Sequence, residues 1–357
     1  MLLRGSFPAL KEKILIRPYA RLLSAAALIA LSVPVMQAAA QQQVSPAPVP
    51  GAQPTPAAPA QPAARPSAPA PTAAPVFPKP NPANFTADTP TKDTVNAFLT
   101  AIWGWDENRV WQTEAILKTQ VAGLSKVVVY VGDKAGKQKP AAFGFFVLPD
   151  GKHIIAGDSV MDFGAQPFAE KRQILEARAD GPYRGAAAKD LEIVEFADFQ
   201  CPHCKEAQAN MDKLATDFPK ARIVFQIFPL TSIHPESGPA AEYALCVNKL
   251  GGSTAFFPFA AAVFDGQEGL ATPDGATLTL NSAAVKAGLD PAKVSACAAT
   301  PAIKQQMETL GKLPDDLGIN ETPMLAINGR EIPANLPYET LKKLVQFQAK
   351  LDGVSLQ

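Results

Sequence analysis

The chain has 357 residues, and its 33 Lys and Arg balance 33 Asp and Glu, so the formal net charge is zero. This length allows about two domains, and the charge balance gives no support for binding nucleic acid or an anionic membrane surface. The 35 prolines are unevenly distributed, which indicates segments of different character along the chain.

The first 40 residues are typical of an export signal. A long basic start precedes an apolar stretch at residues 22–36, and Ala38-Ala39-Ala40 offers a small-residue cleavage site. We therefore predict a signal peptide at residues 1–40 and a periplasmic location, with an uncleaved membrane anchor as the alternative. Export would place the cysteines in a compartment where disulfides persist.

Residues 41–88 consist largely of Pro, Ala, Gln, Ser and Thr. Such a segment has too few bulky apolar residues to offset the entropy of ordering, and its prolines favour an extended polyproline II conformation. We predict a disordered Pro/Ala-rich linker that acts as a spacer.

Residues 89–183 are predicted to form a small α+β domain. Its expected elements are a helix at 95–103, strands at 126–131 and 142–148, and a turn at 149–152 that leads into a hairpin strand at 153–157. No residues in this region have catalytic spacing. His153 stands alone and is expected to be a surface or strand-edge histidine.

Residues 187–357 are predicted to form a second domain, after a hinge at 179–190. The expected elements are buried strands at 191–197 and 221–228, a helix between them, helices within 238–317, a short strand at 324–328, an Asn328-Gly329 turn and a helix at 338–351. The strand–helix–strand unit implies a right-handed parallel crossover.

Cys201 and Cys204 lie two residues apart, at the predicted passage from strand to helix. A structural zinc site usually needs four ligands, and only His203 lies nearby. A structural disulfide across so short a loop would remove little chain entropy. A helix N-terminus, in contrast, stabilises a thiolate and lowers the pKa of the first cysteine. The pattern therefore favours a redox couple.

The segment from residue 191 to 351 resembles the DsbA-like thiol–disulfide oxidoreductases. The likeness rests on Glu195, on Cys201-Pro202-His203-Cys204, on "FPLTSIHP" at 228–235 and on "ETPMLAINGR" at 321–330. The resemblance implies an α/β thioredoxin-like catalytic domain with an inserted helical subdomain, preceded by the small α+β domain. It also implies an enzyme that needs no cofactor or metal.

The resemblance assigns roles to the motif itself. Cys201 would be the exposed nucleophile that forms a mixed disulfide with a client, and Cys204, one turn deeper, would complete the exchange. Pro202 is tolerated in a first helical turn, where no backbone N–H is needed. His203 would stabilise the Cys201 thiolate through its imidazole or through nearby backbone N–H groups.

Three further residues follow from the same resemblance. Glu195 would be a buried acid below the site and a proton relay, with an ordinary strand-edge carboxylate as the alternative. Thr322 and Pro323 match the position of a cis-proline that faces the cysteines, where the Thr322 backbone would bind an extended client segment.

Cys246 and Cys297 are left over and are predicted to pair with each other, as is simplest in an oxidising compartment. A disulfide closing a loop of about 50 residues would contribute about 3–4 kcal/mol. A second redox pair is the alternative. His234, in a predicted loop, is expected to be an ordinary structural histidine.

The stretch "VLPDGKHIIAGD" at 147–158 is similar to the N-terminal domain of the DsbC/DsbG isomerases, which implies a homodimer. The chain thus combines an oxidase-type Cys-Pro-His-Cys with isomerase-type features, and the direction of electron transfer stays open. We predict an exported oxidase with cysteine-containing exported clients, a membrane or soluble redox partner that recycles it, and no nucleic-acid partner. The alternatives are a dimeric disulfide isomerase or reductase, and a non-enzymatic periplasmic chaperone or copper-binding module.

Overall fold

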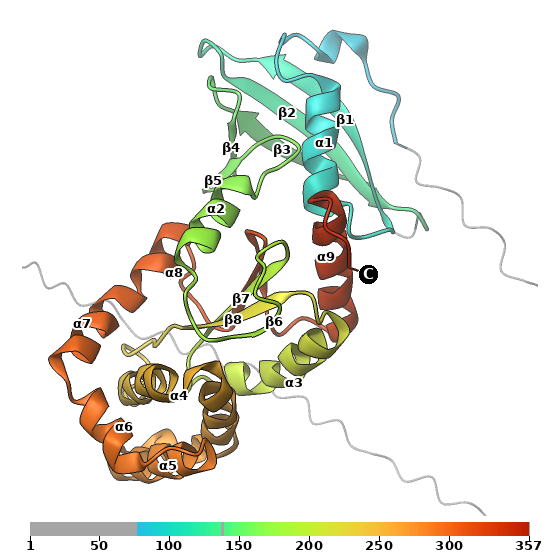
Figure 1. Ribbon diagram of the computed structural model, residues 1–357. Coiled ribbons are helices and arrows are strands. Elements are labelled where there is room, and N and C mark those ends of the chain that lie inside the picture. The colour runs from blue at the N-terminus through green and yellow to red at the C-terminus, as the bar shows by residue number, and fades with distance from the viewer. Residues whose placement is uncertain (1–76, 137–138, 357) are drawn as a thin grey trace, which may run out of the picture. The chain divides into compact units, whose positions relative to one another are not determined.

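The computed structural model describes residues 77–136 and 139–356 (Figure 1). The predicted signal peptide and the linker up to residue 76 lie outside the described residues. Among the residues that are described, no helix is both long and apolar enough to cross a membrane.

An antiparallel sheet forms the first folded region (Figure 1). Its strands follow chain order, namely β1 (Arg109–Lys118), β2 (Ser125–Asp133), β3 (Ala141–Val147), β4 (His153–Ala156) and β5 (Ser159–Asp162). Helix α1 (Lys92–Trp103), capped by the Thr91 side chain, packs Val95 and Phe98 against Val127 and Phe145 of the sheet. The predicted helix and three strands are confirmed. Strand β1 escaped prediction because a bulge between Thr113 and Ala115 breaks its alternation.

The folded part begins earlier than the predicted end of the linker at residue 88. A short 3-10 helix, η1 (Pro82–Asn84), precedes Phe85, which bridges to Ile116 of β1. The backbone N–H groups of Thr86 and Ala87 both donate to the Ile116 carbonyl. Phe85 also packs against the core of the first sheet, so one bulky side chain in a polar-looking stretch fixes this segment.

A second, mixed sheet has the strand order β10-β9-β7-β8-β6. Its strands are β6 (Tyr183–Gly185), β7 (Glu192–Ala197), β8 (Arg222–Ile227), β9 (Met324–Ile327) and β10 (Arg330–Pro333). Strands β7 and β8 pair in parallel, and helix α3 (Pro202–Asp217) connects them, so the predicted parallel connection is confirmed. The other pairings in this sheet are antiparallel. Asn328 and Gly329 both have positive φ, as expected for their turn.

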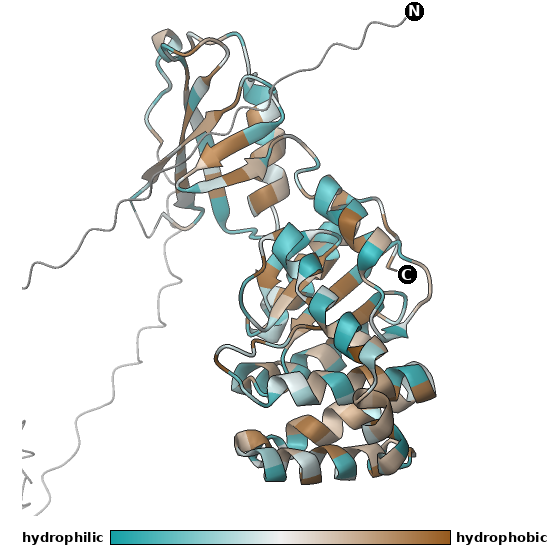
Figure 2. Cartoon of the chain, turned by 90° about the vertical axis from the view of Figure 1, so that its left-hand side faces the viewer, coloured by the Kyte–Doolittle hydropathy of each residue, from teal (hydrophilic) through white to brown (hydrophobic). Residues whose placement is uncertain are grey.

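Helices cover both faces of the second sheet, and β7 and β8 are buried along their whole length. On one face Ile193 packs with residues of α3 and α9 (Tyr338–Leu351); on the other, Val194 packs with α2 (Ala169–Arg178) and α8 (Lys312–Leu317). In Figure 2 the helices of the folded part that face the viewer carry both polar and apolar residues, as expected for amphipathic segments.

The boundary between the two regions differs from the predicted one. Strand β6 lies within the predicted hinge and pairs with β8, so residues 183–185 belong to the second sheet. Helix α2, placed by the sequence in the first domain, buries Leu175 against that sheet. Both elements escaped prediction because β6 is short and Leu175 is the one fully buried residue of α2.

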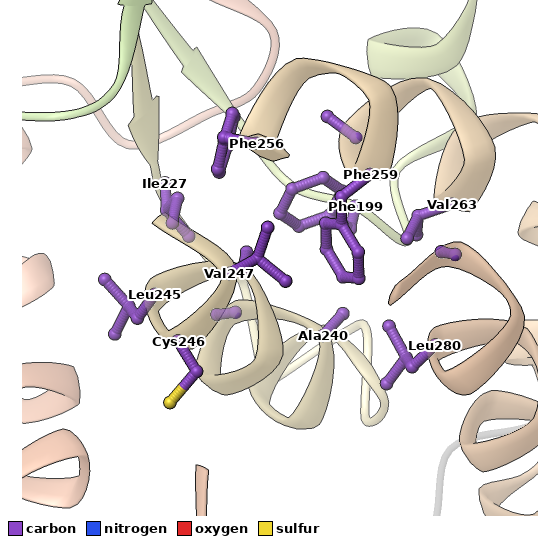
Figure 3. Close-up of a cluster of buried hydrophobic side chains, with 14 of the residues drawn as sticks. Phe199, Ile227, Ala240, Leu245, Cys246, Val247, Phe256, Phe259, Val263 and Leu280 are labelled. Carbon is purple, nitrogen blue, oxygen red and sulfur yellow. The ribbon is translucent and has the colours of Figure 1, made fainter. Parts of the chain in front are cut away.

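A helical insertion follows β8. It comprises α4 (Ser237–Asp265), η2 (Gln267–Ala271), α5 (Pro273–Lys286), α6 (Pro291–Ala298) and α7 (Pro301–Leu310). Phe199, just after β7, stacks on Phe225 and contacts Phe256 and Phe259 of α4 (Figure 3). This aromatic core anchors the chain two residues before Cys201. The thioredoxin-like fold with an inserted helical subdomain is thereby confirmed.

Candidate functional site

The two cysteines of the motif lie at the start of α3. Cys201 is the N-cap residue, Pro202 is the first helical residue and Cys204 lies in the first turn. Both are free thiols, and their exposed fractions are 5% for Cys201 and 0% for Cys204. The Cys201 side chain is therefore less exposed than predicted. One reason is the loop before β9, whose Thr322 carbonyl oxygen lies 3.6 Å from the Cys201 sulfur.

The surroundings move the pKa values of the two thiols in opposite directions. A hydrogen bond from the Cys204 thiol is the largest cause that lowers the pKa of Cys201, to about 5, with Thr322 and the backbone N–H groups of Cys204 and His203 adding to it. Burial is the largest cause that raises the pKa of Cys204, far above its usual range. At neutral pH the pair is thus one thiolate and one thiol.

His203, like Pro202, is an exposed member of the motif. Its Nδ1 lies 3.0 Å from Oε2 of Glu206, and that hydrogen bond raises the pKa of the imidazole. Among the causes that lower the pKa of Cys201, His203 contributes its backbone N–H. The charge of the Cys201 thiolate also contributes to the raised pKa of the His203 imidazole, so the backbone route and the imidazole route both remain predictions.

Glu195 on β7 is buried beneath the motif, so an ordinary strand-edge carboxylate is excluded. Burial raises the pKa of its carboxyl to about 7. Gln208 donates to Glu195 Oε1 at 2.7 Å and to the Cys204 carbonyl at 3.2 Å. Gln208 was not predicted, although it lies one helical turn beyond Cys204 and therefore on the same face of α3.

The loop before β9 completes the site. The Thr322–Pro323 peptide bond is cis, and the Thr322 carbonyl contacts Cys201. The Thr322 hydroxyl is buried and accepts or donates no hydrogen bond within the described residues. Rotation of this hydroxyl toward the sulfur would make it a donor to the thiolate, which accounts for its lowering of the pKa of Cys201.

Asp198 was not predicted from the sequence, although its buried side chain forms hydrogen bonds with Gln200 of the cysteine loop and with Leu230 and His234 of the loop after β8. Asp198 Oδ2 accepts from the Leu230 N–H at 2.8 Å and lies 2.9 Å from Nδ1 of His234. Its Oδ1 accepts from the Gln200 N–H at 2.7 Å, and its own N–H donates to the Cys204 sulfur at 3.4 Å. His234 thus pairs with the buried Asp198 next to the motif and is itself partly exposed. The sequence did offer one signal for Asp198, because a carboxylate that directly follows the buried strand β7 and precedes the cysteine motif is expected to have a partner.

Cys246 of α4 and Cys297 of α6 are joined by a disulfide, with a sequence separation of 51. Cys246 is fully buried in the core of the helical insertion, where Figure 3 shows it beside Leu245 and Val247. Cys297 is only partly buried, so burial covers the Cys246 sulfur alone; the place of Cys246 in the core of the helical insertion favours a structural bond over a second redox pair.

Comparison with known proteins finds matches to the second folded region. Residues 178–346 match the family model described as Thioredoxin. Among curated proteins, a Na⁺/H⁺ antiporter NhaA 1 of Salinispora arenicola is 41% identical over 61 residues, which is 17% of this chain and 9% of that protein. The chain thus covers less than a tenth of that relative, and no transport activity is carried over.

Two solved structures are each similar to about half of this chain. A thioredoxin-like oxidoreductase from Silicibacter pomeroyi is 23% identical, with a TM-score of 0.43, over 50% of this chain and 98% of that chain. The thiol–disulfide exchange protein alpha-DsbA2 from Wolbachia pipientis is also 23% identical, with a TM-score of 0.43, over 50% and 95% of the two chains. The match of residues 178–346 to the Thioredoxin model, together with the strand order β10-β9-β7-β8-β6 and the helical insertion after β8, shows that this segment has a thioredoxin-like fold.

Proposed function

We propose that the protein is an exported thiol–disulfide oxidoreductase that forms disulfides in other exported proteins. The opposite pKa shifts of Cys201 and Cys204 carry this proposal. A stabilised Cys201 thiolate favours the reduced form of the pair, so the disulfide form tends to accept electrons from a client. The basic and apolar N-terminus supports export, and export would supply clients with unpaired cysteines.

The proposed reaction begins with the Cys201–Cys204 disulfide. A client thiolate attacks the Cys201 sulfur, the bond to Cys204 breaks, and Cys204 takes up a proton because its pKa is strongly raised. A second client thiolate then attacks the client sulfur of the mixed disulfide and releases Cys201 as a thiolate. The client loses two electrons and two protons; one proton stays on Cys204 and the other enters solvent.

Two groups around the dithiol have proposed roles in this cycle. Glu195, with a pKa of about 7, can take up and release a proton at neutral pH, and Gln208 connects it to the backbone of Cys204. The loop of Thr322 and Pro323, beside Cys201, is proposed to bind an extended client segment. A membrane or soluble oxidant of the quinone or disulfide class would then accept two electrons from the dithiol.

A disulfide isomerase is the second candidate, because the first sheet exposes a set of large apolar side chains. These are Phe143, Phe146, Val160 and Met161. Together with the likeness of residues 147–158 to the N-terminal domain of the isomerases, these side chains are proposed as contacts for unfolded clients or for a second copy of the chain. An isomerase would start from the dithiol, with the Cys201 thiolate attacking a client disulfide.

The redox potential of the pair, measured by equilibration with glutathione, tests the proposal. We expect a strongly oxidising value and rapid oxidation of a reduced two-cysteine peptide, while scrambled ribonuclease is rescued poorly. A thioredoxin-like potential would indicate a reductase, and efficient rescue of scrambled ribonuclease would indicate the isomerase. Cys204→Ala serves as the control, because it should accumulate the mixed disulfide with Cys201.

A further inference from the structure

Three side chains that can ligate a metal meet where β4, β5 and α2 come together. His153 begins β4, Asp162 ends β5 and Glu170 lies in the first turn of α2. One ligand atom from each lies within 4.8 Å of the other two. We propose that His153, Asp162 and Glu170 bind a divalent transition-metal ion of the zinc class, at a site separate from the redox dithiol.

The donor set and its spacing suit such an ion. Zinc accepts one imidazole nitrogen and carboxylate oxygens at ~2.1 Å, so two tetrahedral ligands are ~3.4 Å apart. The His153 Nε2 to Asp162 Oδ1 distance is 3.4 Å. Glu170 is exposed, and rotation of its side chain can bring the third oxygen into place. The three residues leave room for water as a fourth ligand.

A fourth residue orients the histidine. Asp150 Oδ2 lies 2.5 Å from Nδ1 of His153. The Asp150 side chain is itself held by the N–H groups of Lys152 and His153, at 2.9 and 3.2 Å. With the Nδ1 proton shared with Asp150, the lone pair of Nε2 points to the ligand side, and metal-binding histidines commonly have such a carboxylate partner. The expectation that His153 stands alone is therefore wrong.

The site opens onto solvent through a cavity of about 330 Å³, which His153, Asp162 and Glu170 line together with Glu331. Oε1 of Glu331 is buried and has no hydrogen-bond partner within the described residues, while Oε2 pairs with Lys171. The positive charge of Lys171, which also lines the cavity, is paired with Glu331, so the carboxylates of Asp162 and Glu170 are left to attract a cation. A bound ion would fasten the β4–β5 hairpin to α2, which packs on the second sheet through Leu175.

The test must separate this site from the dithiol, which can itself bind zinc. The full, tag-free chain carrying Cys201→Ala and Cys204→Ala is stripped of metal and titrated with Zn²⁺ by calorimetry, and bound zinc is measured after gel filtration. We expect one equivalent of zinc. His153→Ala in the same background should weaken binding at least tenfold.

Two further variants keep the result interpretable. Asp162→Asn is nearly isosteric, so it should weaken zinc binding without unfolding the chain, as circular dichroism would verify. His203→Ala is the matched control, because His203 also pairs with one carboxylate, that of Glu206, but has no further ligands. It should leave binding unchanged. Zinc should also raise the melting temperature of the parent and of His203→Ala, but not that of Asp162→Asn.

The proposal would be overturned by two results. One is the absence of saturable zinc binding in the chain without Cys201 and Cys204. The other is binding that survives in both His153→Ala and Asp162→Asn, which would place the ion elsewhere on the surface. Neither result bears on the redox function, because the titrated chain lacks the dithiol.

Discussion

The chain contains two cysteine pairs: the activated pair, Cys201 and Cys204, consists of buried free thiols, and the structural pair, Cys246 and Cys297, is a disulfide in which Cys297 is only partly buried. Cys201 and Cys246 have exposed fractions of 5% and 0%. Cys201 begins a helix and has hydrogen-bond donors around its sulfur, whereas Cys246 lies within α4 among apolar side chains. Burial alone raises the pKa of a thiol. The comparison indicates that hydrogen-bond donors placed around the sulfur, rather than exposure, lower the pKa of Cys201.

The largest effect is expected from the activated pair. Cys201→Ala should lower the rate of client oxidation to that of the client alone, because no other free sulfur of the described residues can form the mixed disulfide except the deeper Cys204. The rate of peptide oxidation measures this, and circular dichroism checks the fold. Oxidation that continues in Cys201→Ala would remove the distinction between the two pairs.

The structural pair should affect stability rather than the reaction. Replacing Cys246 and Cys297 by Ala opens a loop of sequence separation 51 and should lower the free energy of unfolding by about 4 kcal/mol. Urea unfolding measures the change. The absorbance of the Cys201 thiolate should keep its midpoint near pH 5. A large shift of that midpoint would show that the disulfide also shapes the redox site.

Glu195 offers a test of buried charge beneath the activated pair. Its folded-state pKa, about 7, lies above that of an unfolded glutamate, so its stabilising effect is present below about pH 4.3 and is lost as pH rises through 7. Glu195→Gln should therefore raise the free energy of unfolding at pH 8 by up to about 3 kcal/mol. Urea unfolding at pH 4, 6 and 8 measures this.

The same variant separates the two possible roles of Glu195. Loss of the proton relay should slow thiol exchange near pH 7, while the amide oxygen of the substituted side chain could still accept the hydrogen bond of Gln208. Unchanged exchange combined with the stability gain would leave Glu195 as a buried acid without a role in the reaction.

A substitution of Asp198 tests whether the hydrogen bonds of its carboxylate stabilise the segments around the dithiol. Asp198→Asn replaces one of the two carboxylate oxygens by an NH₂ group. That group faces either Leu230 and His234, which now share Oδ2, or the Gln200 N–H, which now donates to Oδ1. At least one buried donor then lacks an acceptor, so the free energy of unfolding should fall by about 1–3 kcal/mol. The matched control is Asp212→Asn, an exposed residue whose pairing with Arg184 should matter little. Equal effects of the two variants would contradict this role of Asp198.

The buried strands and helices of the fold could be predicted from the sequence better than the contacts between residues of separate elements. Strands β7 and β8 and helix α3 were predictable because continuous apolar runs and one helical face identify them. The cysteine motif was predictable from its spacing. The Asp198–His234 pair and the His153 cluster were not, since each joins residues from separate loops or elements, and no local pattern records such contacts.

The smallest effect is expected from His203, and it refines the comparison between the two pairs. If the donors that activate Cys201 belong to the backbone, His203→Ala keeps the N–H and should move the midpoint of the thiolate absorbance only slightly above pH 5. The imidazole is exposed and hydrogen-bonded to Glu206, so solvent screens its charge. Cys204→Ala, measured beside it, removes the largest donor and should raise the midpoint toward the free-thiol value of about 8.5. A larger shift in His203→Ala than in Cys204→Ala would assign the activation to the imidazole side chain instead of to the helix start and its thiol.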